Sequence, residues 1–282
     1  MSEGSLPPEL CLDPLGPGRY RVHHPENDPE GRAVVFSGQL LAQTIMASDR
    51  VVEGAKAARS VHTIFSRVGT YDRPLELQVE VVHDGRAFAS HTTTATQGER
   101  VIARSMVLMS AEEPDLVRHA PPMPGVPAPA ELEPAPVLAF PGLETRPVPP
   151  GDPGPSDAPP TESFWMRHPT SFDSSAASQA ILAWSQPGGI IGLAMRPHPE
   201  VVSLGDAHRS VSTGVIAHTS HFQEPFDAGD WLLVVQQATH ASRGRVFGVG
   251  NVFDGSGRLV STFEQDSMLR SPPDRLASKN AM

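Results

Sequence analysis

Two stretches, FSGQLLAQTIMAS at residues 36–48 and LELQVEVVHDG at residues 75–85, carry the pattern that decides the fold. In the first stretch Leu41 and Ile45 are four residues apart, so they share one face of a helix. In the second stretch apolar and polar residues alternate, which indicates a strand with one buried side and one side in water. A helix followed by strands of this kind predicts an α+β unit.

The same order of elements occurs twice along the chain. In the first half, further strands are expected at residues 60–68, 88–96 and 101–111. In the second half, a helix is expected at residues 174–186 and strands at 216–223, 231–242, 245–254 and 258–269. The pair His62-Thr63 also recurs as His218-Thr219, at a spacing of 156 residues. We therefore expect two copies of one unit, each with a helix first and antiparallel strands after it.

A proline-rich segment separates the two copies. Fifteen of the 30 prolines lie between Pro121 and Pro160. Proline fixes φ and has no backbone donor, so this segment is expected to be an extended connector rather than a helix or a central strand. The resulting organisation is an N-terminal tail (1–18), a first domain (19–118), a linker (119–162), a second domain (163–272) and a C-terminal tail (273–282).

Composition limits the class of protein. The 282 residues include 32 acidic and 22 basic side chains, for a formal charge of −10, which argues against binding to nucleic acids or anionic membranes. We find no apolar run long enough to span a membrane and no signal-peptide pattern at the N-terminus. A single cysteine, Cys11, excludes an intrachain disulfide and favours a cytoplasmic location.

Several motifs together resemble the type II acyl-CoA thioesterases, which have a double hotdog fold. They are FSGQLLAQ (36–43), VHTIFSRVG (61–69), HDGRAFASHTTTATQGERVIA (83–103), PFDAGDWLL (225–233) and EQDSMLR (264–270). The resemblance implies two antiparallel sheets, each wrapped around a central helix and joined into one extended sheet. It also implies hydrolysis of fatty acyl-CoA to a free fatty acid and coenzyme A through a bound water, without a cofactor. A dimer or a higher homo-oligomer is expected as well.

The resemblance also assigns candidate catalytic residues. Gly38, at the start of the first helix, is a candidate for stabilising the oxyanion, because a helix N-terminus favours negative charge. The family holds its water with an Asp, a Ser or Thr, and a Gln. The Gln falls on Gln265, whose amide can both donate to and accept from one water. The other two positions fall on Pro187 and Val215, which cannot do this chemistry.

Nearby residues are candidates to replace the two missing groups. Asp206 is a candidate base, and Thr213 would face the same side of the strand as Val215. Three further residues are candidates for substrate binding. Arg243 and Gly244, in the turn SRGR, could meet the phosphates of coenzyme A. His62 lies in one of the resembling motifs, although its match to His218 also favours a structural role for both.

Other functions have less support. Because Pro187 and Val215 depart from the family pattern, the main alternative is a thioesterase-like protein that binds acyl-CoA but hydrolyses it weakly or not at all. A hydratase acting on enoyl-CoA is a third possibility, but its signature stops after Gly205-Asp206. The sequence contains no HExxH zinc motif, no G-x-S-x-G elbow and no G-x-G-x-x-G that opens a helix.

Overall fold

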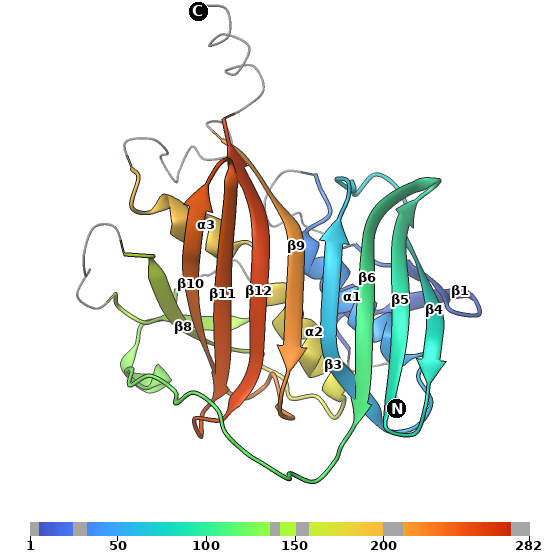
Figure 1. The fold of residues 1–282 in the computed structure, drawn as a ribbon, viewed down its shortest axis with the longest axis horizontal. Helices are drawn as coiled ribbons and strands as arrows, with labels where there is room; N and C mark the ends of the chain where they lie inside the picture. Colours follow the sequence, from blue (N-terminus) through green and yellow to red (C-terminus); the bar gives the residue numbers. More distant parts are fainter. Residues whose placement is uncertain (1–5, 25–32, 136–141, 151–157, 200–210, 272–282) are drawn as a thin grey trace, which may run out of the picture.

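One antiparallel sheet of twelve strands runs through the part of the chain that the computed structural model describes, with the helices packed on one face (Figure 1). The described residues are 6–24, 33–135, 142–150, 158–199 and 211–271. The strands are β1 (Leu12–Gly16), β2 (Arg19–Val22), β3 (Lys56–Phe65), β4 (Glu76–Asp84), β5 (Phe88–Gln97), β6 (Arg100–Ala111), β7 (Glu144–Pro147), β8 (Thr161–Arg167), β9 (Ser212–Phe222), β10 (Leu232–Ser242), β11 (Arg245–Asp254) and β12 (Leu259–Arg270). The α-helices are α1 (Ser37–Asp49), α2 (Ser175–Ser185) and α3 (Gly189–Met195), and short 3-10 helices span Pro8–Leu10 and Pro129–Glu131. None of the described helices combines the length and the apolar character needed to cross a membrane.

The order of the strands shows the internal repeat. It is β1-β2-β4-β5-β6-β3-β9-β12-β11-β10-β8-β7. Of the four strands that follow each central helix, the first (β3 or β9) lies at the centre of the sheet and the second (β4 or β10) lies farthest from it. β3 and β9 pair directly from Ser60↔His221 to Ile64↔Ala217. This seam joins the two copies into one sheet and confirms the α+β architecture expected from the sequence.

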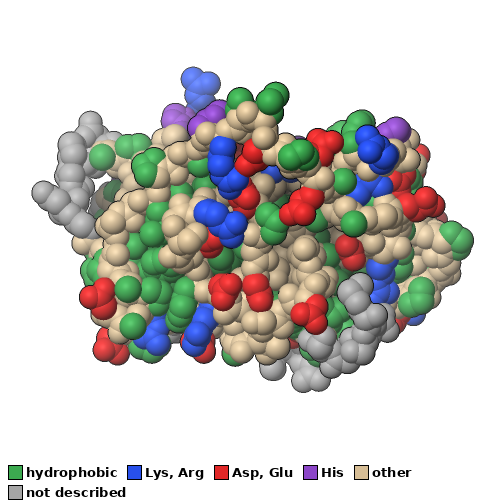
Figure 2. Space-filling view, turned by 90° about the horizontal axis from the view of Figure 1, so that it is seen from below, with side chains coloured by type: hydrophobic (Ala, Val, Ile, Leu, Met, Phe, Trp, Pro, Cys, Tyr) green, Lys and Arg blue, Asp and Glu red, His purple; other side chains and the backbone are tan. Residues whose placement is uncertain are grey.

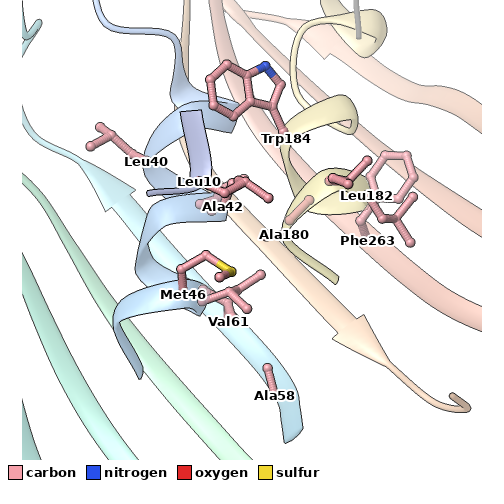
Figure 3. Packing of buried hydrophobic residues seen from close by; sticks show 14 of the residues in the cluster. Leu10, Leu40, Ala42, Met46, Ala58, Val61, Ala180, Leu182, Trp184 and Phe263 are labelled. Carbon is pink, nitrogen blue, oxygen red and sulfur yellow. The ribbon is translucent and has the colours of Figure 1, made fainter. Parts of the chain in front are cut away.

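The two central helices lie side by side against the same face of the sheet. Small residues such as Ala42 and Ala180 lie between the two helices, whereas Leu182 lies next to Phe263 of β12 and Met46 next to Val61 of β3 (Figure 3). Ser174 caps α2 as its side chain accepts a hydrogen bond from the Ala177 amide (3.3 Å). In α1, by contrast, Ser37 is the first helical residue, and the N-cap position is the buried Phe36, which makes no side-chain cap. Packing of Phe36 against Trp184 (6.4 Å between ring centroids) positions this helix start instead of a side-chain cap.

The outer strands and α3 were not expected from the sequence. β1 lies within the segment assigned to an N-terminal tail, and β7 lies within the proline-rich linker. Both are the edge strands of the sheet, and each contains a proline, Pro14 or Pro147. An edge strand tolerates proline because one side of its backbone needs no partner strand.

The linker also covers the outer face of the second copy, on the side of the sheet away from the helices. Trp165, Leu233 and Phe253 form a second apolar cluster there, and Leu132 of the linker is buried in it. The indole Nε1 of Trp165 donates a hydrogen bond to the carbonyl oxygen of Pro127 (3.0 Å). The corresponding face of the first copy leaves Ile64, Met106 and Leu108 exposed.

Candidate functional site

Gln265 lies on the helix side of β12 and is almost completely buried, with 1 % of its surface exposed. Its direct partner across the strand pair is His218 of β9, which is also buried. Gln186, the C-cap residue of α2, approaches the same histidine from the helix layer. Three sequence-distant polar side chains thus meet between the end of α2 and the sheet, beside the seam between the copies.

The three side chains form a continuous hydrogen-bond network. The imidazole Nε2 of His218 lies 3.1 Å from Gln186 Oε1, and its Nδ1 lies 3.4 Å from Gln265 Oε1. Serine hydroxyl groups complete the network. They are Ser220, which donates to Gln186 Oε1 (2.5 Å), Ser261, which accepts from Gln186 Nε2 (3.4 Å), and Ser267, which accepts from Gln265 Nε2 (2.8 Å).

The network determines which imidazole nitrogen carries the proton. The hydroxyl of Ser261 donates to the carbonyl oxygen of His221 (2.7 Å), so toward Gln186 it can only accept. Gln186 must therefore turn Nε2 to Ser261 and Oε1 to the ring, and an amide oxygen only accepts. Consequently Nε2 of His218 is the protonated nitrogen and Nδ1 is an acceptor when the ring is neutral.

This tautomer also determines the orientation of the Gln265 amide. Nδ1 and Oε1 would be two acceptors facing each other, but the two ends of an amide have nearly the same shape. A half turn about the last side-chain bond of Gln265 lets Nε2 donate to Nδ1 and lets Oε1 accept from the Ser267 hydroxyl. We assign this orientation, because it satisfies every member of the network.

The site is uncharged. Burial lowers the pKa of His218 from 6.5 to about 3, so the ring stays neutral at neutral pH. The ring of Phe263 stacks on the imidazole with 5.7 Å between centroids, which keeps water away from one face. The site can therefore orient a polar ligand or a water through hydrogen bonds, but His218 cannot act as an acid at neutral pH. In the described residues, no group of three His, Cys, Asp or Glu side chains could hold a metal ion.

The structure shows why sequence comparison missed Gln186. The family's acidic position falls on Pro187 in the sequence, but Pro187 lies at the bend between α2 and α3. The side chain that enters the site belongs to the preceding residue, Gln186. Two features of the sequence indicate Gln186: it is a polar residue directly before a proline, and the helical pattern ends at it. Val215, at the Ser/Thr position, packs in an apolar cluster with Ile191 and Met195.

The two matching histidines do not occupy equivalent places, although the match between the two halves predicted that they do. His218 faces the helices, whereas His62 lies on the outer face and its Nδ1 contacts Thr219 Oγ1 (2.8 Å). The residue that shares the inner face with His218 across the seam is Thr63. A shift of one residue moves a strand side chain to the opposite face, which explains the difference. The structure therefore separates His62 from Gln265.

Gly38 lies beside the end of α2. A Cβ at this position would overlap the carbonyl oxygen of Trp184, and it would lie 2.6 Å from Cε1 of Phe36. Trp184 is two residues before Gln186, so the start of α1 and the hydrogen-bond network lie at the same end of α2. The absence of a side chain at Gly38 thus allows the two helices to come this close.

The other predicted residues lie at varied places. Thr213 is opposite Leu269 and Val215 is opposite Ser267, so both face the helix side of the sheet, as expected. Arg243 and Gly244 form the turn between β10 and β11, both with positive φ (51° and 74°). The carbonyl oxygen of Gly244 accepts a hydrogen bond from the amide of Leu269, four positions beyond Gln265 along β12. Asp206 lies outside the described residues, so its role stays a prediction.

A cleft of about 870 Å³ opens at the other end of the seam. It lies where β3 begins and β6 and β9 end, beside the start of α2, and Figure 2 shows this end of the molecule, with acidic and basic groups close together. Its lining includes Arg59, Arg118, Gln179, Phe222 and Phe226. Phe222 is four residues from His218 along β9, or about 13 Å in an extended strand.

Comparisons with known proteins agree with this architecture. Residues 24–110 match the family model described as the acyl-CoA thioesterase N-terminal domain, and residues 117–269 match that of the C-terminal domain. The chain is 25 % identical over 265 residues to acyl-CoA thioesterase 2 of Haemophilus influenzae, covering 87 % of this chain and 91 % of that one. It is also 25 % identical over 296 residues to human acyl-coenzyme A thioesterase 8, covering 96 % and 90 %.

Solved structures show the same fold. The acyl-CoA thioesterase II TesB2 from Mycobacterium marinum superposes with a TM-score of 0.78 at 24 % identity, covering 94 % of this chain and 96 % of that one. A protein of unknown function with a hot dog fold from Alicyclobacillus acidocaldarius superposes with a TM-score of 0.74 at 19 % identity, covering 94 % and 97 %. The expected double hotdog fold is thereby confirmed.

Proposed function

Because the chain belongs to the acyl-CoA thioesterase family, we propose that it hydrolyses fatty acyl-CoA to a free fatty acid and coenzyme A. The observation that carries the proposal is the buried amide of Gln265, held by His218 and Ser267 beside the end of α2. Gln265 is the member of the family's water-binding set that this chain retains. In the assigned orientation one N–H and one lone pair of its amide remain free, and these can hold a water.

The reaction needs no group beyond water and the thioester. The water oxygen bonds to the carbonyl carbon, the bond from carbon to sulfur breaks, and one water proton ends on the sulfur of coenzyme A. Gly38 supports stabilisation of the developing oxyanion, since it lies at the start of α1 and against the carbonyl of Trp184, two residues before Gln186. Asp206 and Thr213 stay candidates for assisting the water, and Arg243 and Gly244 for binding phosphate.

The cleft supports a substrate with a long flexible arm. A molecule bound there must bridge about 13 Å along β9 to reach the level of His218. An acyl-CoA carries two such arms, the pantetheine chain and the acyl chain. We propose that one of them enters through this cleft.

We further propose that the protein works in the cytoplasm as a homo-oligomer. The support for self-association is the apolar part of the outer face of the first copy, where Met106 is 67 % exposed beside Ile64 and Leu108. The corresponding face of the second copy is covered by the linker. We also propose that the first domain spans residues 19–118 and the second domain residues 163–272.

The direct test is steady-state hydrolysis of a panel of acyl-CoAs of increasing chain length, followed by release of free thiol. We expect turnover on at least one chain length, and we expect Gln265→Ala to lower kcat about 100-fold, since it removes an oriented hydrogen-bonding group from the reaction site. KM should change less than kcat. Micromolar binding without turnover on any chain length would instead identify an acyl-CoA-binding protein.

A further inference from the structure

The network around Gln265 contains two residues that the family pattern does not supply for the reaction, Gln186 and His218. We propose that both are positioning residues: Gln186 selects the tautomer of His218, and the ring then selects which end of the Gln265 amide faces the reacting water. The inference rests on the proposed function and deepens it. In this arrangement, a chain of hydrogen bonds between uncharged groups stands where the family has an acidic group at the end of α2.

The donor and acceptor roles along this chain of hydrogen bonds follow from the residue at its fixed end, Ser261. Ser261 donates to the backbone carbonyl of His221 and therefore cannot donate to Gln186. This single constraint orients the Gln186 amide, and the amide oxygen then requires a proton on Nε2 of His218 (3.1 Å). An amide at residue 186 therefore controls Gln265 without contacting it.

At Gln265, the far end of this chain of hydrogen bonds, the tautomer of His218 determines how the amide is oriented. With Nδ1 as an acceptor, the assigned half turn of the Gln265 amide directs Nε2 toward the ring and Oε1 toward Ser267. With the other tautomer, Nδ1 would donate to Oε1 and the amide would present its opposite end to a water. Since positioning of a reacting group by about 1 Å can change a rate 100-fold, selecting one amide orientation matters for catalysis.

Neighbouring charges do not offer an alternative acid or base within the network. On the helix side of the sheet, His218 faces Gln186 from α2, Gln265 from β12 and Thr63 from β3. The nearest titratable groups, His62, Glu264 and Asp266, lie on the outer face of the same strands. Catalysis by this network should therefore depend on orientation and not on titration of its members.

The test compares Gln186→Leu, Gln186→Glu and a control, Gln43→Leu. Leucine removes the acceptor for His218 Nε2, so kcat should fall about tenfold with KM within about twofold of the wild type. Glutamate keeps an oxygen toward His218, and in its protonated form its hydroxyl can donate to Ser261 as the amide does. We therefore expect kcat to be maintained while the carboxyl is protonated and to fall as it ionises, which adds a new limb to a pH profile that is level for the wild type between pH 5 and 9. Gln43 is a buried glutamine of α1 that bonds the carbonyl oxygens of Glu9 and His23, so its loss should leave kcat unchanged.

A second measurement reads the tautomer itself. In protein labelled with ¹⁵N-histidine, the long-range ¹H–¹⁵N spectrum should show His218 protonated at Nε2, with His218→Asn identifying the signal. A proton on Nδ1, or an unchanged kcat in Gln186→Leu, would overturn the proposal. If the wild type hydrolyses no acyl-CoA, the proposed function fails, while the tautomer in the wild type and in Gln186→Glu still decides the positioning chain.

Discussion

Gly38→Ala is expected to destabilise the protein by about 3 kcal/mol or more, at the upper end of the range for overpacking a core. The added methyl group would overlap the carbonyl oxygen of Trp184 and lie 2.8 Å from its carbonyl carbon. Both are backbone atoms of α2, so no side-chain rotation can relieve the clash, and the two central helices must separate. Urea unfolding followed by circular dichroism measures the change.

A second glycine provides the control for Gly38. Gly192 in α3 has no atom within 4 Å of the position where its Cβ would be placed. Gly192→Ala should therefore be neutral or stabilise the protein by up to about 1 kcal/mol, because alanine restricts the unfolded chain and favours the helix. Equal urea midpoints for Gly38→Ala and the wild type would show that α1 and α2 do not make the contact described.

The second large effect is a loss of stability in acid caused by His218. Burial lowers the pKa of this ring to about 3 in the folded protein, whereas an exposed histidine in the unfolded chain has a pKa of about 6.5. Above pH 6.5 both states hold the neutral ring and no pH dependence arises. Below pH 6.5 only the unfolded state binds the proton, so stability falls as the pH falls, by about 2 kcal/mol between pH 6.5 and pH 5.

The contribution of His218 can be separated from that of other histidines. Burial also lowers the pKa values of His24 and His91, so the wild type combines several contributions of the same sign. The free energy of unfolding should be measured at pH 7 and pH 5 for the wild type, His218→Gln and His62→Gln. We expect the free energy of unfolding to differ less between pH 7 and pH 5 in His218→Gln than in the wild type, and His62→Gln to behave like the wild type. The same pH dependence in His218→Gln and the wild type would contradict a buried, neutral ring.

The repeated unit was predictable because its signals are local. The helical spacing in residues 36–48 and the alternation in residues 75–85 each operate within about ten residues, and the structure places α1 and β4 there. The edge strands β1 and β7 carry no such signal. Both contain proline and become strands only because a neighbouring strand supplies partners for their backbone groups.

The candidate site was only partly predictable, for a different physical reason. Gln265 was found from its motif, but Gln186 and the separate environments of His62 and His218 each depend on a difference of one residue. A bend after α2 changes which side chain enters the site, and strand parity decides which face a histidine occupies. Motif matching does not determine either, since both depend on how distant segments pair.

The direct pairing of β3 with β9 has a consequence for any attempt to produce one copy alone. If the polypeptide were cut at the linker, β3 in one fragment and β9 in the other would become edge strands. Their backbone donors and acceptors on that side would lose their partners. The simplest way for a fragment to satisfy them is to pair with a second identical fragment through the same strand. The linker of the present molecule therefore keeps as one permanent pair two units that would otherwise have to find a partner for the same strand.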